Sequence, residues 1–342
     1  MSFVYVLSQE NIENPPGNVY VIDTSTHAVI STIRMSEVPN SIAITPNGQF
    51  AYVGNTVLMG GIQTISVIDI KSNFVIAVVA LDSLPSFIVI SPDGQFVYVE
   101  TNDGITVIDS KKNLVTATIT INTGIAVTFA ITPNGKFIYF PGFDTVSVID
   151  TKSNHIIATI ETAGNTEELA ITPNGKFVYV VDEAEQITVI DTKTQSIIAT
   201  VNIEERIQNI VFTLDSQFAY VSDNDTDTIF VIDVKTHALI ARVRGKMGTG
   251  NLIITPNGQF VYVVNEFSTA ITVVDVKTHA VIATTQVVGN PIDLVITSDS
   301  QFVYVVSILN QAGIVSVIEV KTHSIIATVE VGLNPVAIAI TP

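Results

Sequence analysis

The chain has no cysteine and no tryptophan among its 342 residues. Without cysteine it can form no disulfide, no thiolate metal site and no cysteine nucleophile, and thiol usage gives no indication of its redox compartment. Charged residues make up only 14% of the sequence, whereas apolar residues make up 47%. This balance is typical of a protein with many buried strands and excludes a disordered chain.

Long apolar segments are also missing. No apolar run approaches the roughly 18 residues that a membrane-spanning helix needs. The sequence starts directly with a strand-like segment instead of a basic segment and a hydrophobic signal region. We therefore expect a soluble protein with no membrane span, and no signal peptide in this chain.

What the sequence does contain is one unit of 40 to 47 residues, repeated eight times. Each unit is anchored by Phe-x-Tyr, at Phe3/Tyr5, Phe50/Tyr52, Phe96/Tyr98, Phe137/Tyr139, Phe177/Tyr179, Phe218/Tyr220, Phe260/Tyr262 and Phe302/Tyr304. A repeat that runs from the first of these anchors to the end of the sequence leaves no room for a second domain. Residues 1–342 are thus predicted to form a single repeat domain.

Every unit holds four short strand-like segments separated by turn signals. In the seventh unit these are residues 260–264, 271–275, 281–285 and 292–297, and no segment has a helical apolar stripe. Four strands per unit predict an all-β fold, an eight-bladed β-propeller whose blades are four-stranded antiparallel sheets. A β-solenoid is the main alternative, but its repeating rungs are shorter than these units.

The two ends of the sequence predict how the propeller closes. The chain begins inside a unit, at residues 3–6, and ends with residues 337–342, after which the next Phe-x-Tyr would follow. The C-terminal strand is therefore expected to join the N-terminal blade and to supply its missing fourth strand.

The motifs of the units resemble those of the YVTN-repeat β-propellers over the whole chain. The residues that carry the resemblance are Tyr-Val-x-Asn or Tyr-Val-x-x-Asn segments at 52–55, 98–102 and 262–265, and Pro-Asn-Gly or Pro-Asp-Gly turns at 46–50, 92–96, 133–137, 173–177 and 256–260. The resemblance implies a propeller similar to surface-layer and cell-surface binding modules, and hence an extracytoplasmic or cell-surface location. It also implies more distant enzymatic relatives among propeller lactonases, lyases and cofactor-dependent oxidoreductases, so that the fold alone does not indicate the function.

Two recurring features are interpreted as structure. The Pro-Asn-Gly and Pro-Asp-Gly turns suit tight hairpins. An acid ends one strand of every unit, where it is expected to accept backbone N–H groups of the following turn. These acids are Asp23, Asp69, Asp109, Asp150, Asp191, Asp233, Asp275 and Glu319.

The five histidines are expected to share one position in the turn after that acid. We assign His27, His155, His237, His279 and His323 to this position, with Gln195, Phe74 and Leu114 filling it in other units. Histidines of adjacent blades cannot share one metal ion, because packed sheets are about 10 Å apart. We therefore expect the histidines to have a structural role in the turns. The Phe-x-Tyr residues are likewise expected to pack between blades.

Charge divides unevenly between the two ends of the units. The short turns, which we call the turn end, hold ten lysines against eleven acids, a net charge of −1. The longer connections at the opposite end, the loop end, hold 21 acids against five basic residues, a net charge of −16. The loop end also carries the length variation, in residues 7–18, 54–64, 222–228 and 242–251, and long variable loops on a rigid scaffold are common binding sites.

The acidity of the loop end predicts cations or basic proteins as partners and excludes nucleic acid. One loop, with Asp223, Asp225 and Asp227 at alternate positions, has the carboxylate spacing of a calcium loop. It lacks the following glycine and the distal glutamate of such loops, so an ordinary polar turn is the alternative. Ca²⁺ is the only cofactor that the sequence suggests.

A second candidate site lies where the strand before each Pro-Asn-Gly-type turn begins. These positions differ from unit to unit, whereas the positions below them on the same strands are aliphatic, and a small ligand at the channel mouth would contact this set. Its members are Ser41, Phe87, Thr128, Glu168, Asn209, Asn251 and Asp293, with Ala337 at the eighth position.

The function we expect is a non-enzymatic binding scaffold, a monomer that presents its acidic loop end to a protein or cationic ligand. No Ser-His-Asp, Cys-His or His-rich metal arrangement is found at that end. The alternative is a metal-dependent propeller hydrolase or lyase, with Glu168, Asp293, Asn209 and Asn251 as oxygen ligands and Glu168 as base. A quinone or haem redox module is disfavoured by the lack of tryptophan and cysteine.

Overall fold

The structure is a computed structural model that describes residues 2–10, 17–57, 61–121, 128–183, 185–223 and 225–342. In these residues, 32 strands form eight four-stranded antiparallel sheets, seven of them meanders of consecutive strands and one completed by the C-terminal strand. The protein is thus an all-β, eight-bladed propeller, as the repeat predicts. Parts of the loops 7–18 and 54–64 lie outside the described residues.

The chain divides into two compact units of four blades each, and each unit is described by itself. Unit 1 comprises Met1–Ile121 and Val287–Pro342, and unit 2 comprises Asn122–Gln286. The strands of unit 1 are β1 (Phe3–Ser8), β2 (Gly17–Asp23), β3 (Ala28–Met35), β4 (Val38–Ile44), β5 (Phe50–Thr56), β6 (Gln63–Asp69), β7 (Phe74–Leu81), β8 (Pro85–Ile90), β9 (Phe96–Thr101), β10 (Gly104–Asp109), β11 (Leu114–Thr120), β28 (Asn290–Ile296), β29 (Phe302–Leu309), β30 (Ala312–Glu319), β31 (Ser324–Leu333) and β32 (Pro335–Ile340).

The strands of unit 2 are β12 (Ala130–Ile131), β13 (Phe137–Pro141), β14 (Thr145–Asp150), β15 (His155–Glu161), β16 (Thr166–Ile171), β17 (Phe177–Asp182), β18 (Gln186–Asp191), β19 (Ser196–Asn202), β20 (Ile207–Phe212), β21 (Phe218–Asp223), β22 (Thr228–Asp233), β23 (Ala238–Arg244), β24 (Thr249–Ile254), β25 (Phe260–Asn265), β26 (Ala270–Asp275) and β27 (Ala280–Gln286). The strands expected in the seventh unit correspond to β25–β28, with ends that differ by one or two residues. We call the strand before each Pro-Asn-Gly-type turn the first strand of its blade.

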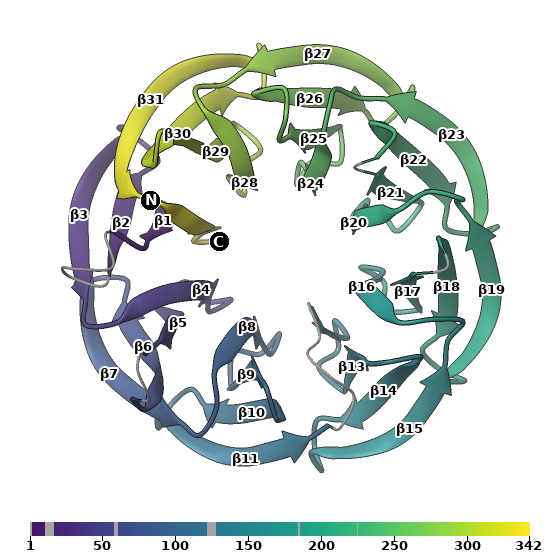
Figure 1. Cartoon of the computed structure of the whole chain (residues 1–342), viewed down its shortest axis with the longest axis horizontal. Coiled ribbons are helices and arrows are strands. Elements are labelled where there is room, and N and C mark those ends of the chain that lie inside the picture. The colour runs from purple at the N-terminus through teal and green to yellow at the C-terminus, as the bar shows by residue number, and fades with distance from the viewer. Residues whose placement is uncertain (1, 11–16, 58–60, 122–127, 184, 224) are drawn as a thin grey trace. The chain divides into compact units, whose positions relative to one another are not determined.

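Blades are named by their sheets: β32-β1-β2-β3, β4–β7, β8–β11 and β28–β31 in unit 1, and β12–β15, β16–β19, β20–β23 and β24–β27 in unit 2 (Figure 1). The C-terminal strand β32 pairs antiparallel with β1, with Val4 opposite Ile340 and Leu7 opposite Ala337. The Phe3 N–H also donates to Thr341 Oγ1 at 2.8 Å. The predicted closure of the N-terminal blade by the C-terminal strand is confirmed.

The Pro-Asn-Gly turns are tight hairpins held by a preceding threonine. Thr45 Oγ1 accepts hydrogen bonds from the N–H groups of Gln49 and Phe50, and it donates to Asn47 Oδ1. Gly48 has a φ of +66°, a conformation that glycine adopts without steric cost. The structural interpretation of these turns is therefore confirmed.

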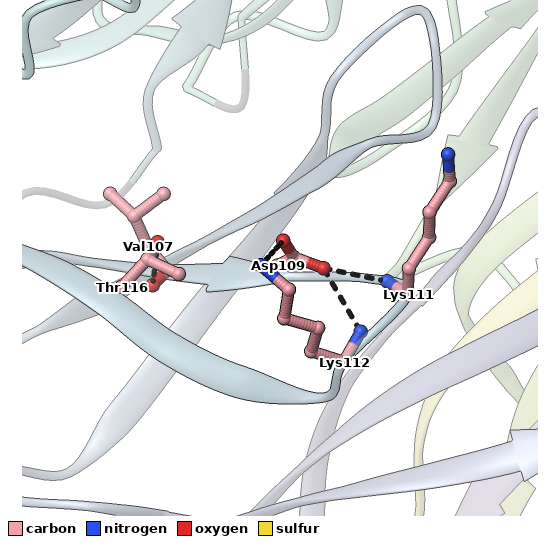
Figure 2. Close-up of polar contacts among 5 residues, drawn as sticks. All are labelled: Val107, Asp109, Lys111, Lys112 and Thr116. Carbon is pink, nitrogen blue, oxygen red and sulfur yellow. Dashed lines mark hydrogen bonds and ion pairs between the residues drawn. The ribbon is translucent and has the colours of Figure 1, made fainter.

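The acids that end the third strands cap the turns that follow them, as Figure 2 shows for Asp109. Its Oδ1 accepts the N–H groups of Lys111 and Lys112 at 3.0 and 2.9 Å, and Lys112 Nζ lies 3.3 Å from Oδ2. Hydrogen bonds to the ionised form hold the pKa of Asp109 below its usual value. In the turn shown by Figure 2, the carboxylate is engaged in holding the backbone.

The fourth residue after each capping acid adopts a left-handed backbone conformation. This observation corrects our alignment of the histidines. His155 does not share this position; it begins β15, and Asn154 (φ +56°) takes the place before it. Phe74 and Leu114 are displaced in the same way, and Gln195 is assigned correctly. The residues at this position are His27, Asn73, Asn113, Asn154, Gln195, His237, His279 and His323, with φ between 52° and 57°. Asparagine suits this conformation because its short polar side chain tolerates positive φ.

This left-handed residue binds the buried tyrosine of a neighbouring blade. The Tyr179 hydroxyl lies 2.7 Å from His237 Nδ1, and the His237 ring packs edge-on against Phe177 with centroids 4.9 Å apart. Desolvation lowers the pKa of His237, so the imidazole is favoured in its neutral form. The same contact joins Tyr5 to Asn73 and Tyr52 to Asn113 at 3.0 Å, Tyr220 to His279 at 2.8 Å and Tyr304 to His27 at 2.7 Å. The Phe-x-Tyr repeat is thus an inter-blade contact, as predicted.

Tyr139 is an exception to this pattern. Its hydroxyl is buried without a hydrogen-bond partner, and burial raises its pKa to about 12. In the next blade the left-handed position is held by Gln195. A buried hydroxyl without a partner lowers stability, because it loses its hydrogen bonds to water.

The two tyrosines give a matched pair of substitutions. We expect Tyr179→Phe to lower the free energy of unfolding by about 1–3 kcal/mol, because it leaves His237 without its partner. Tyr139→Phe removes a hydroxyl that has no partner, so its free energy of unfolding should be unchanged or higher. Urea denaturation of the two variants and the wild type measures both effects, and equal losses would contradict the interlock.

Candidate functional site

The seven candidate ligand-binding residues are divided between the two units. Ser41, Phe87 and Asp293 belong to first strands of unit 1, namely β4, β8 and β28. Glu168, Asn209 and Asn251 belong to the first strands β16, β20 and β24 of unit 2, and Thr128 precedes β12 there. Strand β20 contacts both β16 and β24, so that three of the candidates lie on neighbouring strands.

In unit 1 the polar candidates are engaged in local hydrogen bonds. Ser41 Oγ donates to Asn40 Oδ1 at 2.8 Å, and Asn40 Nδ2 donates to the carbonyl of Pro85 at 2.7 Å. The Leu294 N–H donates to Asp293 Oδ1 at 2.8 Å. These bonds hold the beginnings of β4 and β28, and give the side chains a structural role.

Glu168 is a strongly perturbed acid of unit 2. Leu169 packs with residues of the β12–β15 blade, whereas Ala170 packs with residues of the β20–β23 blade. Because side chains alternate along a strand, Glu168 shares the face of Ala170 and is directed toward β20. Burial raises its pKa to about 8, and no described residue gives it a hydrogen bond or an opposite charge.

The next first strand, β20, carries further polar atoms without partners. Asn209 Oδ1 and Gln208 Oε1 are buried and accept no hydrogen bond. Asn209 lies opposite Ser222, whose Oγ is also buried and without a partner. Buried polar atoms are nearly always hydrogen-bonded, so each of these three atoms is suited to a hydrogen bond from a ligand or from water.

Glu266 extends this group toward β24, and sequence reasoning missed it. Gln208 hydrogen-bonds its carboxylate, and burial raises its pKa. A Cβ at Gly250 would lie 2.7 Å from Glu266 Oε1, so that glycine makes room for the carboxyl. Glu266 follows the Tyr-Val-x-Asn motif directly, but the motif alone gives no sign of the contact with β20.

The predicted calcium loop is arranged as a hydrogen-bonded turn. Asp223 is fully buried, and its two carboxylate oxygens accept the N–H groups of Asp225 and Thr226 at 2.8 and 3.1 Å. Asp227 Oδ1 accepts the Gly248 N–H at 2.8 Å, and Asp225 is exposed. Residue 224 lies outside the described residues. Within the part of the chain that the structure describes, no three His, Asp or Glu side chains are grouped to hold a metal.

A family comparison gives a partial match. A model described as a lactonase, seven-bladed β-propeller, matches residues 204–305, less than a third of the chain. This segment holds Asn209, Asn251 and Asp293 but not Glu168. No curated protein sequence matches the chain significantly.

Solved structures show the same fold at low identity. The dihydro-heme d1 dehydrogenase NirN in complex with DHE is 12% identical, with a TM-score of 0.81 over 98% of this chain and 74% of that one. The hydrazine synthase of Kuenenia stuttgartiensis is 23% identical, with a TM-score of 0.61 over 79% of this chain and 94% of that one. At these identities the similarity establishes the propeller fold and no function.

Among the described residues, no helix is long and apolar enough to cross a membrane.

Calcium binding by the loop of Asp223, Asp225 and Asp227 stays a prediction. If the loop binds Ca²⁺, millimolar Ca²⁺ should raise the melting temperature of the protein. A ligand at a hundredfold excess over its Kd stabilises the folded state by about 2.7 kcal/mol. The rise should be absent with Mg²⁺ or chelator, and in Asp225→Ala. A melting temperature that Ca²⁺ leaves unchanged would reject the site.

Glu168 predicts a pH-dependent stability. Its pKa is higher in the folded chain, about 8, than in the unfolded chain, so between these values only the unfolded chain releases the proton. Stability therefore falls as the pH rises toward 8. We expect Glu168→Gln to raise the free energy of unfolding by at least about 1 kcal/mol at pH 9 and to change it little at pH 4. Equal effects at the two pH values, measured by urea denaturation, would contradict the burial of this carboxyl.

Proposed function

We propose that this protein is a non-enzymatic binding scaffold whose loop end recognises a basic protein or another cationic ligand. The proposal concerns unit 2, where the acids of the loop end are most numerous. Its resemblance to surface-layer and cell-surface propellers favours an extracytoplasmic or cell-surface location.

The observation that carries the proposal is a set of exposed acids without ionic partners. Glu161, Glu185, Glu204 and Asp225 are exposed, and none of them forms an ion pair with a described residue. They come from the end of β15 and from the loops β17–β18, β19–β20 and β21–β22. A cationic partner would supply the opposite charge that these carboxylates lack among the described residues.

The turn end provides a contrast within the same unit. There the acids are engaged in capping, as when Asp191 Oδ1 accepts the Lys193 and Thr194 N–H groups at 3.0 and 2.8 Å. Lys136, Lys176 and Lys235 lie near such turns. The two ends of unit 2 therefore differ in charge, and the exposed Glu161 and Glu204 at the loop end do not cap a turn as Asp191 does.

A binding experiment tests the proposal. We expect a labelled oligolysine peptide to bind the wild type with an affinity that falls as salt is added, because exposed charges are screened. The variant Glu161→Gln/Glu204→Gln/Asp225→Asn should bind about tenfold more weakly, which corresponds to about 1.4 kcal/mol.

The matched control for charge is Lys136→Gln/Lys176→Gln/Lys235→Gln, which removes the same number of charges from the turn end. Its affinity for oligolysine should equal or slightly exceed that of the wild type. An equal loss in both variants, or no binding to the wild type, would reject an acidic binding end.

A second candidate function is a hydrolase or lyase that acts at the first strands of unit 2. It is favoured by Glu168, whose buried carboxyl has a pKa of about 8 and therefore suits general acid–base chemistry. The partial match to the lactonase model favours lactones as the substrates to try. Opening of a simple lactone by the wild type, lost in Glu168→Gln, would support this candidate, and an unreactive wild type would reject it.

A further inference from the structure

Two large apolar side chains are exposed on adjacent loops of unit 2. Met247, in the β23–β24 loop, is 60% exposed, and Phe267, in the β25–β26 loop, is 66% exposed. Single exposed apolar residues are common on protein surfaces, but adjacent ones at loop tips are typical of binding surfaces. Methionine and aromatic residues are also enriched at protein interfaces.

The two loops are in direct contact. Gly248 has a φ of +78°, and a Cβ at this residue would lie 2.7 Å from the Phe267 ring. The Glu266 N–H donates to the Gly248 carbonyl at 2.8 Å, which joins the residues that precede Phe267 and follow Met247. The two exposed side chains therefore belong to one surface, which we call the Met247–Phe267 patch.

Hydrogen bonds from a third loop and from β25 fix the backbone beneath Met247. The Gly245 and Gly248 N–H groups donate to the carbonyl and the carboxylate of Asp227, at 2.7 and 2.8 Å. The Lys246 N–H donates to Asn265 Oδ1 at 3.0 Å. A backbone held in this way loses little conformational entropy on binding, which favours the patch as a preorganised anchor site.

The surroundings of the patch are acidic. The loops that form it contribute Asp225, Asp227 and Glu266 to its surroundings, against Lys246 and the exposed Arg244 that directly precedes the Met247 loop. Asp225 is exposed and free of ion pairs with described residues. A partner that covers this surface therefore gains from basic side chains around an apolar one.

We infer that the Met247–Phe267 patch anchors a basic peptide segment of a partner protein, by an apolar side chain that has lysine or arginine neighbours. This inference rests on the proposed binding function and specifies its partner. The flexible thioether of Met247 can adapt to leucine or phenylalanine, while Phe267 supplies a flat apolar surface. The acids nearby then attract the basic residues of the same segment.

Two labelled peptides separate the apolar contribution from the charge. One consists of lysines with interspersed leucines, and the other has serine in place of each leucine. We expect the leucine peptide to bind the wild type at least about tenfold more tightly, and Met247→Ser/Phe267→Ser to remove most of this difference.

Phe143→Ser is the matched control, because Phe143 is 68% exposed on the β13–β14 loop of the same unit. It should leave the binding of both peptides unchanged. If the double variant fails to fold, Met247→Ser replaces it in the test. This variant changes only an exposed side chain and should remove part of the preference for the leucine peptide.

The outcomes distinguish the inference from the proposed function. Equal binding of the two peptides by the wild type, or an unchanged leucine preference in Met247→Ser/Phe267→Ser, would overturn the patch and leave the acidic binding end standing. Failure of both peptides to bind the wild type would overturn the proposed function as well.

Discussion

Five buried tyrosines hydrogen-bond a residue in the turn of the neighbouring blade, whereas Tyr139 has no such partner. A hydroxyl such as that of Tyr179 is shielded from water, and His237, in the left-handed position of the adjacent blade, supplies its hydrogen bond. That position exists because the preceding Asp233 caps its own turn, accepting the Thr236 N–H at 2.7 Å. Cap, left-handed residue and tyrosine thus form one connected set, and a change in any of them affects the packing between blades.

This dependence explains why the two ends of the blades differ. At the turn end, the length of each turn is fixed by the need to place the left-handed residue against a tyrosine, so that the capping acids there have little freedom. The loop end has no such requirement, and its connections vary in length and sequence. Side chains can therefore vary there at little cost to the fold, and the residues of the proposed binding surface, Met247 and Phe267 among them, lie at this end of unit 2.

The sequence predicts the repeating part of this structure well and the individual sites less well. Blade number, strand number and the closure by β32 follow from periodicity, which averages over eight copies. The position of His155 was wrong because the alignment followed the imidazole instead of counting four residues from the acid, which leads to Asn154. The calcium loop is a different case. The spacing of Asp223 and Asp225 in the sequence does not show that Asp223 is buried and bonded to its own turn. Glu266 and Gln208 come from different blades, so only the packing brings them together.

Two polar features of unit 2, the buried Glu168 and the exposed acids of the loops, differ in their environment, and this difference distinguishes the roles we propose for them. Glu168 is desolvated and has a pKa of about 8, so it is largely neutral at pH 7 and can donate a hydrogen bond. The exposed acids Glu161, Glu204 and Asp225 lie in solvent, where the proposed cationic partner would meet them. In this proposal the attraction of a basic segment depends on the loops, whereas Glu168 on its first strand suits a smaller, uncharged group. A ligand at the first strands and a protein on the loops need not compete, because they use different atoms and different physical forces.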